Sequence, residues 1–213
     1  MEKSLSTRVY IDGFNLYYRA VRNTRYRWLD LVRLCRLTLS PQNKIEKLRY
    51  FTADVSGRRD KDAPRRQQVY LRALKTLPEI SIHKGNFLST IKWAEIADPP
   101  NDFVRPNPVT VSVVKTEEKG SDVNLASYLL YDAFNQHFDV AVVLSNDTDL
   151  VELIRMVKEE LNKPVGIICP SPNAARSLKK VATFMRHIAS SRLAASQFPD
   201  QIPGTTIRKP PSW

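Results

Sequence analysis

The chain has few of the residues that build metal-thiolate or histidine-based active sites. Only Cys35 and Cys169 and three histidines occur among its 213 residues. The cysteines lie in separate apolar stretches with no CxxC, so we expect two buried free thiols. The histidines, His83, His137 and His187, are scattered, which argues against a histidine general base. The six glycines form neither GxxxxGK[ST] nor GxGxxG, which disfavours a nucleotide triphosphatase or a dinucleotide enzyme.

Long apolar runs are also missing. No stretch approaches the roughly 20 apolar residues that cross a bilayer, and the first ten residues lack the apolar core of a signal peptide. We therefore expect a cytoplasmic protein without a membrane partner. Hydrophobic residues make up 42% and charged residues 26% of the chain, which are ordinary globular values.

Positive charge is concentrated in one third of the sequence. Residues 1–75 contain 18 Lys and Arg against 7 Asp and Glu, whereas the remainder has 15 of each, and the whole chain carries +11. A localised basic excess is typical of a phosphate-binding surface. It is equally typical of a surface that merely keeps the protein soluble, and charge alone does not separate the two.

Apolar periodicity predicts strands alternating with helices, which is typical of an α/β protein with a parallel sheet. We expect one domain over residues 1–190, interrupted by a proline-containing excursion at about 92–108 that shapes a groove or mediates self-association. Residues 191–213 have little to bury and are predicted to be a flexible tail. The predicted strands are 8–11, 44–55, 79–87, 109–115, 138–144 and 164–169, and the predicted helices are 28–39, 57–75, 121–136, 149–162 and 174–181.

Aspartates follow two predicted strands and begin one predicted helix. Asp12 comes directly after the first strand, Asp147 and Asp149 follow strand 138–144, and Asp122 lies in the first turn of a helix. Each alone is more typical of a helix cap than of a catalyst. In a parallel sheet, however, all four belong to the edge where the strands end, which is where ligands bind.

Four converging carboxylates repel one another unless a cation lies between them. An oxygen-only donor set without a nearby histidine or cysteine favours Mg²⁺ or Mn²⁺. Such an ion activates water for attack on phosphorus. A basic surface beside an acidic metal site is typical of a protein that acts on a phosphodiester.

Three segments carry a family resemblance. They are VYIDGFNLYY at 9–18, EKGSDVNLA at 118–126 and VVLSNDTDL at 142–150. In this order they resemble the NYN domains of the PIN-like nuclease superfamily, and most of all the bacterial branch labelled LabA-like. The resemblance runs from about residue 8 to 169. It implies a PIN-like, three-layer α/β/α fold with a mostly parallel central sheet, and metal-dependent endoribonuclease chemistry.

The resemblance also implies roles for single residues. Asn15 matches the family's polar residue after the first strand, and Ser145 matches the small hydroxyl residue of the last motif; both are expected to bind the substrate. Many relatives have a further acidic residue in the central helix where this chain has Tyr128, which favours one metal ion over two. The residues that match the family's acidic positions are Asp12, Asp122, Asp147 and Asp149.

Several basic side chains are candidates for RNA contacts. Lys119 precedes the aspartate motif and is as consistent with a phosphate contact as with a plain surface lysine. Aromatic residues at 17–28 alternate with arginines, a pattern that suits base stacking, although core packing explains some of them better. The best candidates for contacts to the RNA backbone are the clustered Arg58, Arg59, Arg65 and Arg66, for which a solvated helix face is the alternative.

Three functions are compatible with the sequence. The first is a metal-dependent endoribonuclease with Mg²⁺ or Mn²⁺, acting on single-stranded RNA, in which the complete set of four aspartates carries the chemistry. The alternative is a non-catalytic RNA-binding or protein-interaction module on the same fold. Small-molecule chemistry on this scaffold is a third option, because a fold does not fix a function.

Overall fold

One seven-stranded sheet organises the protein. The computed structural model describes every residue except 1–3, 59, 98–108 and 212. The strand order is β4-β3-β2-β1-β5-β6-β7, and every neighbouring pair is parallel except the antiparallel pair β3 and β4. The strands are β1 (Leu5–Asp12), β2 (Asn43–Ala53), β3 (Ile80–Glu95), β4 (Thr110–Lys119), β5 (Val140–Leu144), β6 (Val165–Cys169) and β7 (Phe184–His187).

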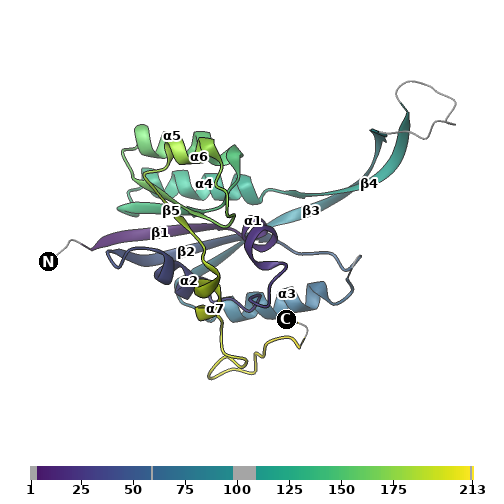
Figure 1. Ribbon diagram of the computed structural model, residues 1–213, viewed down its shortest axis with the longest axis horizontal. Coiled ribbons are helices and arrows are strands. Elements are labelled where there is room, and N and C mark those ends of the chain that lie inside the picture. Colours follow the sequence, from purple (N-terminus) through teal and green to yellow (C-terminus); the bar gives the residue numbers. More distant parts are fainter. Residues whose placement is uncertain (1–3, 59, 98–108, 212) are drawn as a thin grey trace.

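Helices cover both faces of the sheet, which confirms the three-layer α/β/α architecture (Figure 1). One face carries α4 (Ser121–Phe134), α5 (Val151–Glu159) and α6 (Arg176–Val181), and the other carries α2 (Leu31–Thr38), α3 (Ala63–Leu74) and α7 (Ser190–Ala195). The short α1 (Gly13–Leu16), the π-helix η1 (Tyr17–Val21) and the 3-10 turn η2 (Thr148–Leu150) lie in the connections.

The central strands supply both hydrophobic cores. Along β1, Val9 and Ile11 pack into the core beneath α2 and α3, whereas Tyr10 packs into the core beneath α4 and α5. This follows from the period of two in a strand, which sends successive side chains to opposite faces. All five residues of β5 are buried, as the sequence predicts for a central parallel strand.

Some element boundaries differ from the prediction. The helix expected from residue 57 begins at Ala63, with Pro64 in its first turn, where its missing N–H costs nothing. Strand β3 runs to Glu95 because it pairs with β4 along its outer half. The predicted excursion at 92–108 therefore begins as regular hairpin, and its part from 98 to 108 lies outside the described residues.

The prediction of a flexible tail over residues 191–213 is wrong for the described residues. Phe198 is buried in the core beneath α2. The indole Nε1 of Trp28 donates to the carbonyl of Pro199 at 2.8 Å, and the Trp28 and Trp213 rings lie 6.1 Å apart. The segment has few apolar residues, but they meet a buried aromatic cluster that sequence periodicity does not reveal.

Two expectations from composition can be compared with the structure. Cys35 and Cys169 are both buried and unpaired, as predicted. Among the described residues, no helix combines the length and the apolar character needed to cross a membrane.

A buried carboxylate fastens α4 to the sheet. The Asp132 side chain is fully buried and pairs with Arg8 of β1 at 2.7 Å and with Arg49 of β2 at 2.8 Å. It also accepts the hydroxyl of Tyr10 at 2.7 Å. Burial by itself raises the Asp132 pKa, but hydrogen bonds from these three residues and from His137 outweigh it and hold the pKa at about 2.

We predict that Asp132→Asn destabilises the protein by about 3 to 5 kcal/mol at pH 7, because two guanidinium groups lose their buried counter-charge. A depressed carboxyl pKa stabilises the folded state above pH 4, and this stabilisation is lost as the pH falls from about 4 to about 2. The variant should therefore show a flatter pH dependence in that range. Urea denaturation measures both effects.

Asp54→Asn is the matched control for this experiment. Asp54 also forms an ion pair, with Lys84 at 2.6 Å, but its side chain is 57% exposed. Exposed pairs contribute less than about 1 kcal/mol. Equal losses for the two variants would show that the Asp132 network does not hold α4 in place.

Candidate metal centre

The candidate site lies where the strand order changes direction. Along the chain, β2, β3 and β4 are added in turn on one side of β1, and β5 is then added on the other side of β1. Ligands of such sheets bind beyond the carboxyl ends of the strands at this point. Asp12 is the last residue of β1, and Asp147 follows the end of β5 by three residues.

Three of the four predicted aspartates come together here. Carboxylate oxygens of Asp12, Asp122 and Asp147 all lie within 4.8 Å of one another. Asp12 and Asp147 come from neighbouring strand ends, whereas Asp122 enters from the first turn of α4. Three negative groups at this spacing repel one another strongly, and that repulsion favours a bound cation.

Asp12 is held rigidly. It is 6% exposed, and its two oxygens accept the backbone N–H of Asn15 at 2.9 Å and the hydroxyl of Ser145 at 3.0 Å. Burial raises the Asp12 pKa, these hydrogen bonds oppose the rise, and the nearby charge of Asp147 adds to it. The residue thus caps α1 and faces the site at the same time.

The loop after β5 is fixed by amide and hydroxyl groups. Ser145 Oγ accepts the N–H of Asp147 at 3.1 Å while donating to Asp12. Asn15 Oδ1 accepts the N–H of Asn146 at 3.1 Å, which joins α1 to this loop. Asn15 and Ser145, predicted as substrate-binding residues, therefore support the aspartates through hydrogen bonds.

Asp122 is the carboxylate most affected by its neighbours. Partial burial, followed by the charges of Asp12, Asp147, Glu118 and Asp149, raises the Asp122 pKa to about 6. Asp149 lies in η2, is exposed, and is outside the three-carboxylate group. The charge of Asp149 still contributes to the raised pKa of Asp122, so Asp149 belongs to the edge of the site.

The turn before α4 sets the position of Asp122. Gly120 has φ +97°, a left-handed conformation that favours glycine. Glu118 accepts the N–H of Ser121 at 3.0 Å and its hydroxyl at 2.5 Å, which caps the helix start. Gly85 of β3 lies against this turn, and a Cβ there would be 2.6 Å from the Lys119 carbonyl oxygen.

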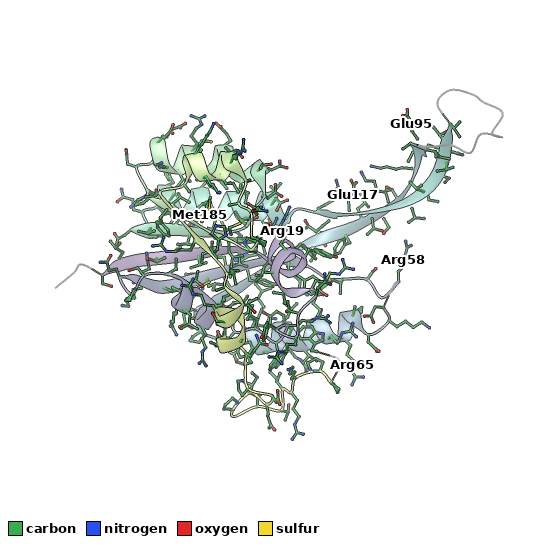
Figure 2. All side chains as sticks on the ribbon, viewed as in Figure 1. Arg19, Arg58, Arg65, Glu95, Glu117 and Met185 are labelled. Atoms are coloured by element: carbon green, nitrogen blue, oxygen red, sulfur yellow. The ribbon has the colours of Figure 1, made fainter. Side chains whose placement is uncertain are left out.

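The predicted RNA-contacting residues are dispersed. Lys119 ends β4, is exposed, and lies 3.5 Å from Glu117. Figure 2 shows Arg58 and Arg65 extending from the loop before α3 and from α3 itself, whereas Arg19 lies beside α1. Arg66 forms an ion pair with Asp60, and Arg59 lies outside the described residues.

Sequence reasoning included Arg19 among the arginines that alternate with aromatic residues, but it missed Lys179. Burial raises the Cys169 pKa, while the charges of Arg19 and Lys179 oppose that rise. Arg19 belongs to η1, and Lys179 lies in the last turn of α6. Sequence reasoning also missed Glu118, which accepts hydrogen bonds from Ser121, and Asn146, whose side chain joins the loop after β5 to residues 173 and 175.

The donor set fits a hard divalent cation. All three groups offer carboxylate oxygen, the ligand that Mg²⁺ and Mn²⁺ prefer. Two of them, Asp12 and Asp147, are already oriented by hydrogen bonds. The raised pKa of Asp122 marks charge that a bound cation would neutralise.

Fold and site together define a three-layer α/β protein with an acidic centre at its topological switch point. The model of the NYN domain family matches residues 6–190, and the chain belongs to this family.

Two known proteins are similar to this chain, one in sequence and one in fold. The 6-hydroxy-3-succinoylpyridine 3-monooxygenase HspA of Pseudomonas putida is 35% identical over 98% of this chain and 75% of its own length. A protein of unknown function from Vibrio parahaemolyticus has a crystal structure that matches with a TM-score of 0.54 and 14% identity, covering 89% of this chain and 96% of that one. The second comparison supports the fold alone.

We predict that Asp122→Asn leaves the metal-free protein equally stable at pH 7, or up to about 1 kcal/mol more stable after screening by solvent. A raised carboxyl pKa means that the folded parent loses stability as the pH rises from about 4 to about 6. The difference in the free energy of unfolding between the variant and the parent should therefore vanish at pH 4. Urea denaturation in EDTA measures it.

Asp147→Ala is the contrasting variant, because the Asp147 carboxylate accepts the N–H of Asp149 at 3.0 Å and caps η2, and alanine has no oxygen to replace it. It should lose about 1 kcal/mol. A loss of several kcal/mol in Asp122→Asn instead would mean that Asp122 has a structural role and is not a repelled ligand.

Proposed function

We propose that this protein is a divalent-metal-dependent endoribonuclease that hydrolyses phosphodiester bonds of single-stranded RNA with Mg²⁺ or Mn²⁺. The observation that carries the proposal is the group of three carboxylates within 4.8 Å at the switch point. An all-oxygen site suits a cation that binds phosphate oxygens, and NYN domain membership adds weight to a nuclease.

Each aspartate has a distinct task in this proposal. Asp12, Asp122 and Asp147 would hold one cation, which when bound supplies charge stabilisation at phosphorus and lowers the pKa of water. Asp149, exposed at the edge, would orient the attacking water. Tyr128 packs against His83 at 4.1 Å between ring centroids and offers no carboxylate, which supports a single ion.

The same proposal assigns RNA binding to basic side chains on both sides of the acidic centre. Arg19 lies in η1, directly after α1, and Lys179 lies in α6, whereas Lys119 ends β4, three residues before Asp122. Arg58, Arg59, Arg65 and Arg66 would extend the contacts along the α3 side. We also propose the cytoplasm as the compartment, which the two unpaired buried thiols support.

We predict that the purified protein cleaves single-stranded RNA with Mn²⁺ or Mg²⁺ and that EDTA stops it. Asp12→Asn and Asp147→Asn should each lower the rate 100-fold or more, because an electrostatic contribution of this kind is lost. Both variants should still bind RNA, since the basic surface supplies most of the affinity. Gel assays of cleavage and fluorescence anisotropy of binding separate the two effects.

Asp54→Asn is again the matched control and should cleave like the parent. Cleavage that persists in Asp12→Asn would indicate a contaminating nuclease or a wrong site. Tight RNA binding by a parent that cleaves no RNA would favour the non-catalytic binding module.

A further prediction concerns salt. RNA affinity should fall steeply with salt concentration, and Arg58, Arg59, Arg65 and Arg66 replaced together by Ala should lower the slope by about one unit per lost phosphate contact. Arg66 should contribute least, because Asp60 already neutralises it. Titrations at several salt concentrations give the slope. An unchanged slope would move the RNA path to Arg19, Lys119 and Lys179.

The relative's name supports a second candidate function, monooxygenation of a hydroxylated pyridine. That reaction consumes O₂ and a two-electron donor, placing one oxygen atom on the ring and releasing the other as water. The three carboxylates favour the first candidate, because oxygen-activating iron sites commonly include histidine ligands. Oxygen consumption with NADH and 6-hydroxy-3-succinoylpyridine, with and without added Fe²⁺, decides between them.

A further inference from the structure

The β3–β4 hairpin forms an arm that leaves the body of the protein (Figure 1). β3 pairs with β2 only over Ile80–Gly85. Beyond it, residues 86–95 pair with 110–119 alone, and Figure 2 shows Glu117 midway along the arm and Glu95 near its outer end. An isolated two-stranded hairpin is marginally stable in water, so this arm gains from a partner surface.

One face of the arm is apolar and exposed. Ile91 and Val114 are direct cross-strand partners, and Trp93 shares their face because side chains alternate along a strand. Their exposed fractions are 75%, 62% and 73%. Large apolar groups gathered on one face mark a contact surface more often than scattered ones do.

The outer side of α4 is a second exposed apolar surface. Val123, Tyr131 and Phe134 follow one stripe of the helix and are 69%, 59% and 77% exposed. The stripe ends at an open apolar pocket of about 370 Å³ between α4 and α5, lined by Leu130, Phe134, Met156 and Leu161, with Glu160 at its polar part.

We propose that two copies of this chain form a two-fold dimer in which the arm of each copy docks on the α4–α5 surface of the other, with Trp93 seated in the apolar pocket. Figure 1 shows that the arm extends away from its own helical layer, so it cannot cover its own α4. Both halves of the contact are present on one chain, which makes the contact reciprocal.

The area supports a second copy over an unrelated partner. Ten paired residues make a ribbon of roughly 33 Å by 10 Å, so one docked arm buries on the order of 650 Å² in total. That is below the size of a stable interface, whereas two reciprocal contacts reach about 1,300 Å² and fall within the standard range.

Sedimentation velocity of the full chain tests the proposal without metal or RNA, so its result is independent of the proposed nuclease activity. The parent should be a dimer, and Trp93→Ser and Phe134→Asp should each weaken association at least tenfold. Leu37→Asp is the control, because Leu37 is also exposed, at 43%, but lies on α2. Circular dichroism verifies that each variant is folded.

Mixing the two variants is the sharpest test. An equimolar mixture of Trp93→Ser and Phe134→Asp retains one intact arm facing one intact pocket, so it should associate more strongly than either variant alone. Fluorescence from the remaining Trp93 should shift to shorter wavelength as the ring is buried.

Three outcomes would overturn the proposal. These are a monomeric parent, a Phe134→Asp variant that dimerises like the parent, and a mixture that associates no better than its components. If the parent is monomeric and Trp93→Ser binds an oligonucleotide more weakly, the arm is a nucleic-acid surface instead.

Discussion

The buried carboxylate of Asp132 is the interaction on which the geometry of the site depends. It joins α4 to β1 through Arg8 and Tyr10 and to β2 through Arg49. Because Asp122 lies on the same helix, this anchor sets where its carboxylate meets the other two. A fully buried carboxylate is stable only when such partners surround it. The ion-paired carboxylate of Asp132 inside the fold therefore holds α4 so that Asp122 stays beside the other acidic side chains at the edge of the sheet.

That contrast separates the structural carboxylates from the candidate ligands. Asp132 has a depressed pKa of about 2 because cations and donors surround it, whereas Asp122 has a pKa raised to about 6 beside other acids. Both belong to α4, and neither chain position nor residue type distinguishes them. Only the charges brought close by the fold do so. Asp122 lies beside other acidic side chains without a neutralising cation of the protein, so it is the carboxylate that a bound metal ion would stabilise.

The comparison with a monooxygenase shows why family and site must be weighed together. NYN domain membership and an all-oxygen donor set favour phosphodiester chemistry, while a relative with 35% identity is named for an oxidation. A scaffold with its site at a strand-order switch can carry either chemistry, since the loops and donors differ without changing the sheet. Measurements of metal binding and of O₂ consumption are therefore more informative than further resemblance.

The sequence by itself determined the alternating strands and helices, the buried central strand at Val140–Leu144, and the three motifs that bring Asp12, Asp122 and Asp147 to one edge. These features depend on local periodicity and on short runs of residues, which can be read along the chain. Only the tertiary structure decided that Glu95 continues a paired arm, that Phe198 and Trp213 pack on Trp28, and that Arg8 and Arg49 meet on Asp132. Each of these joins residues far apart in the chain, and such contacts are selected by the packing of the whole fold, which no local pattern records.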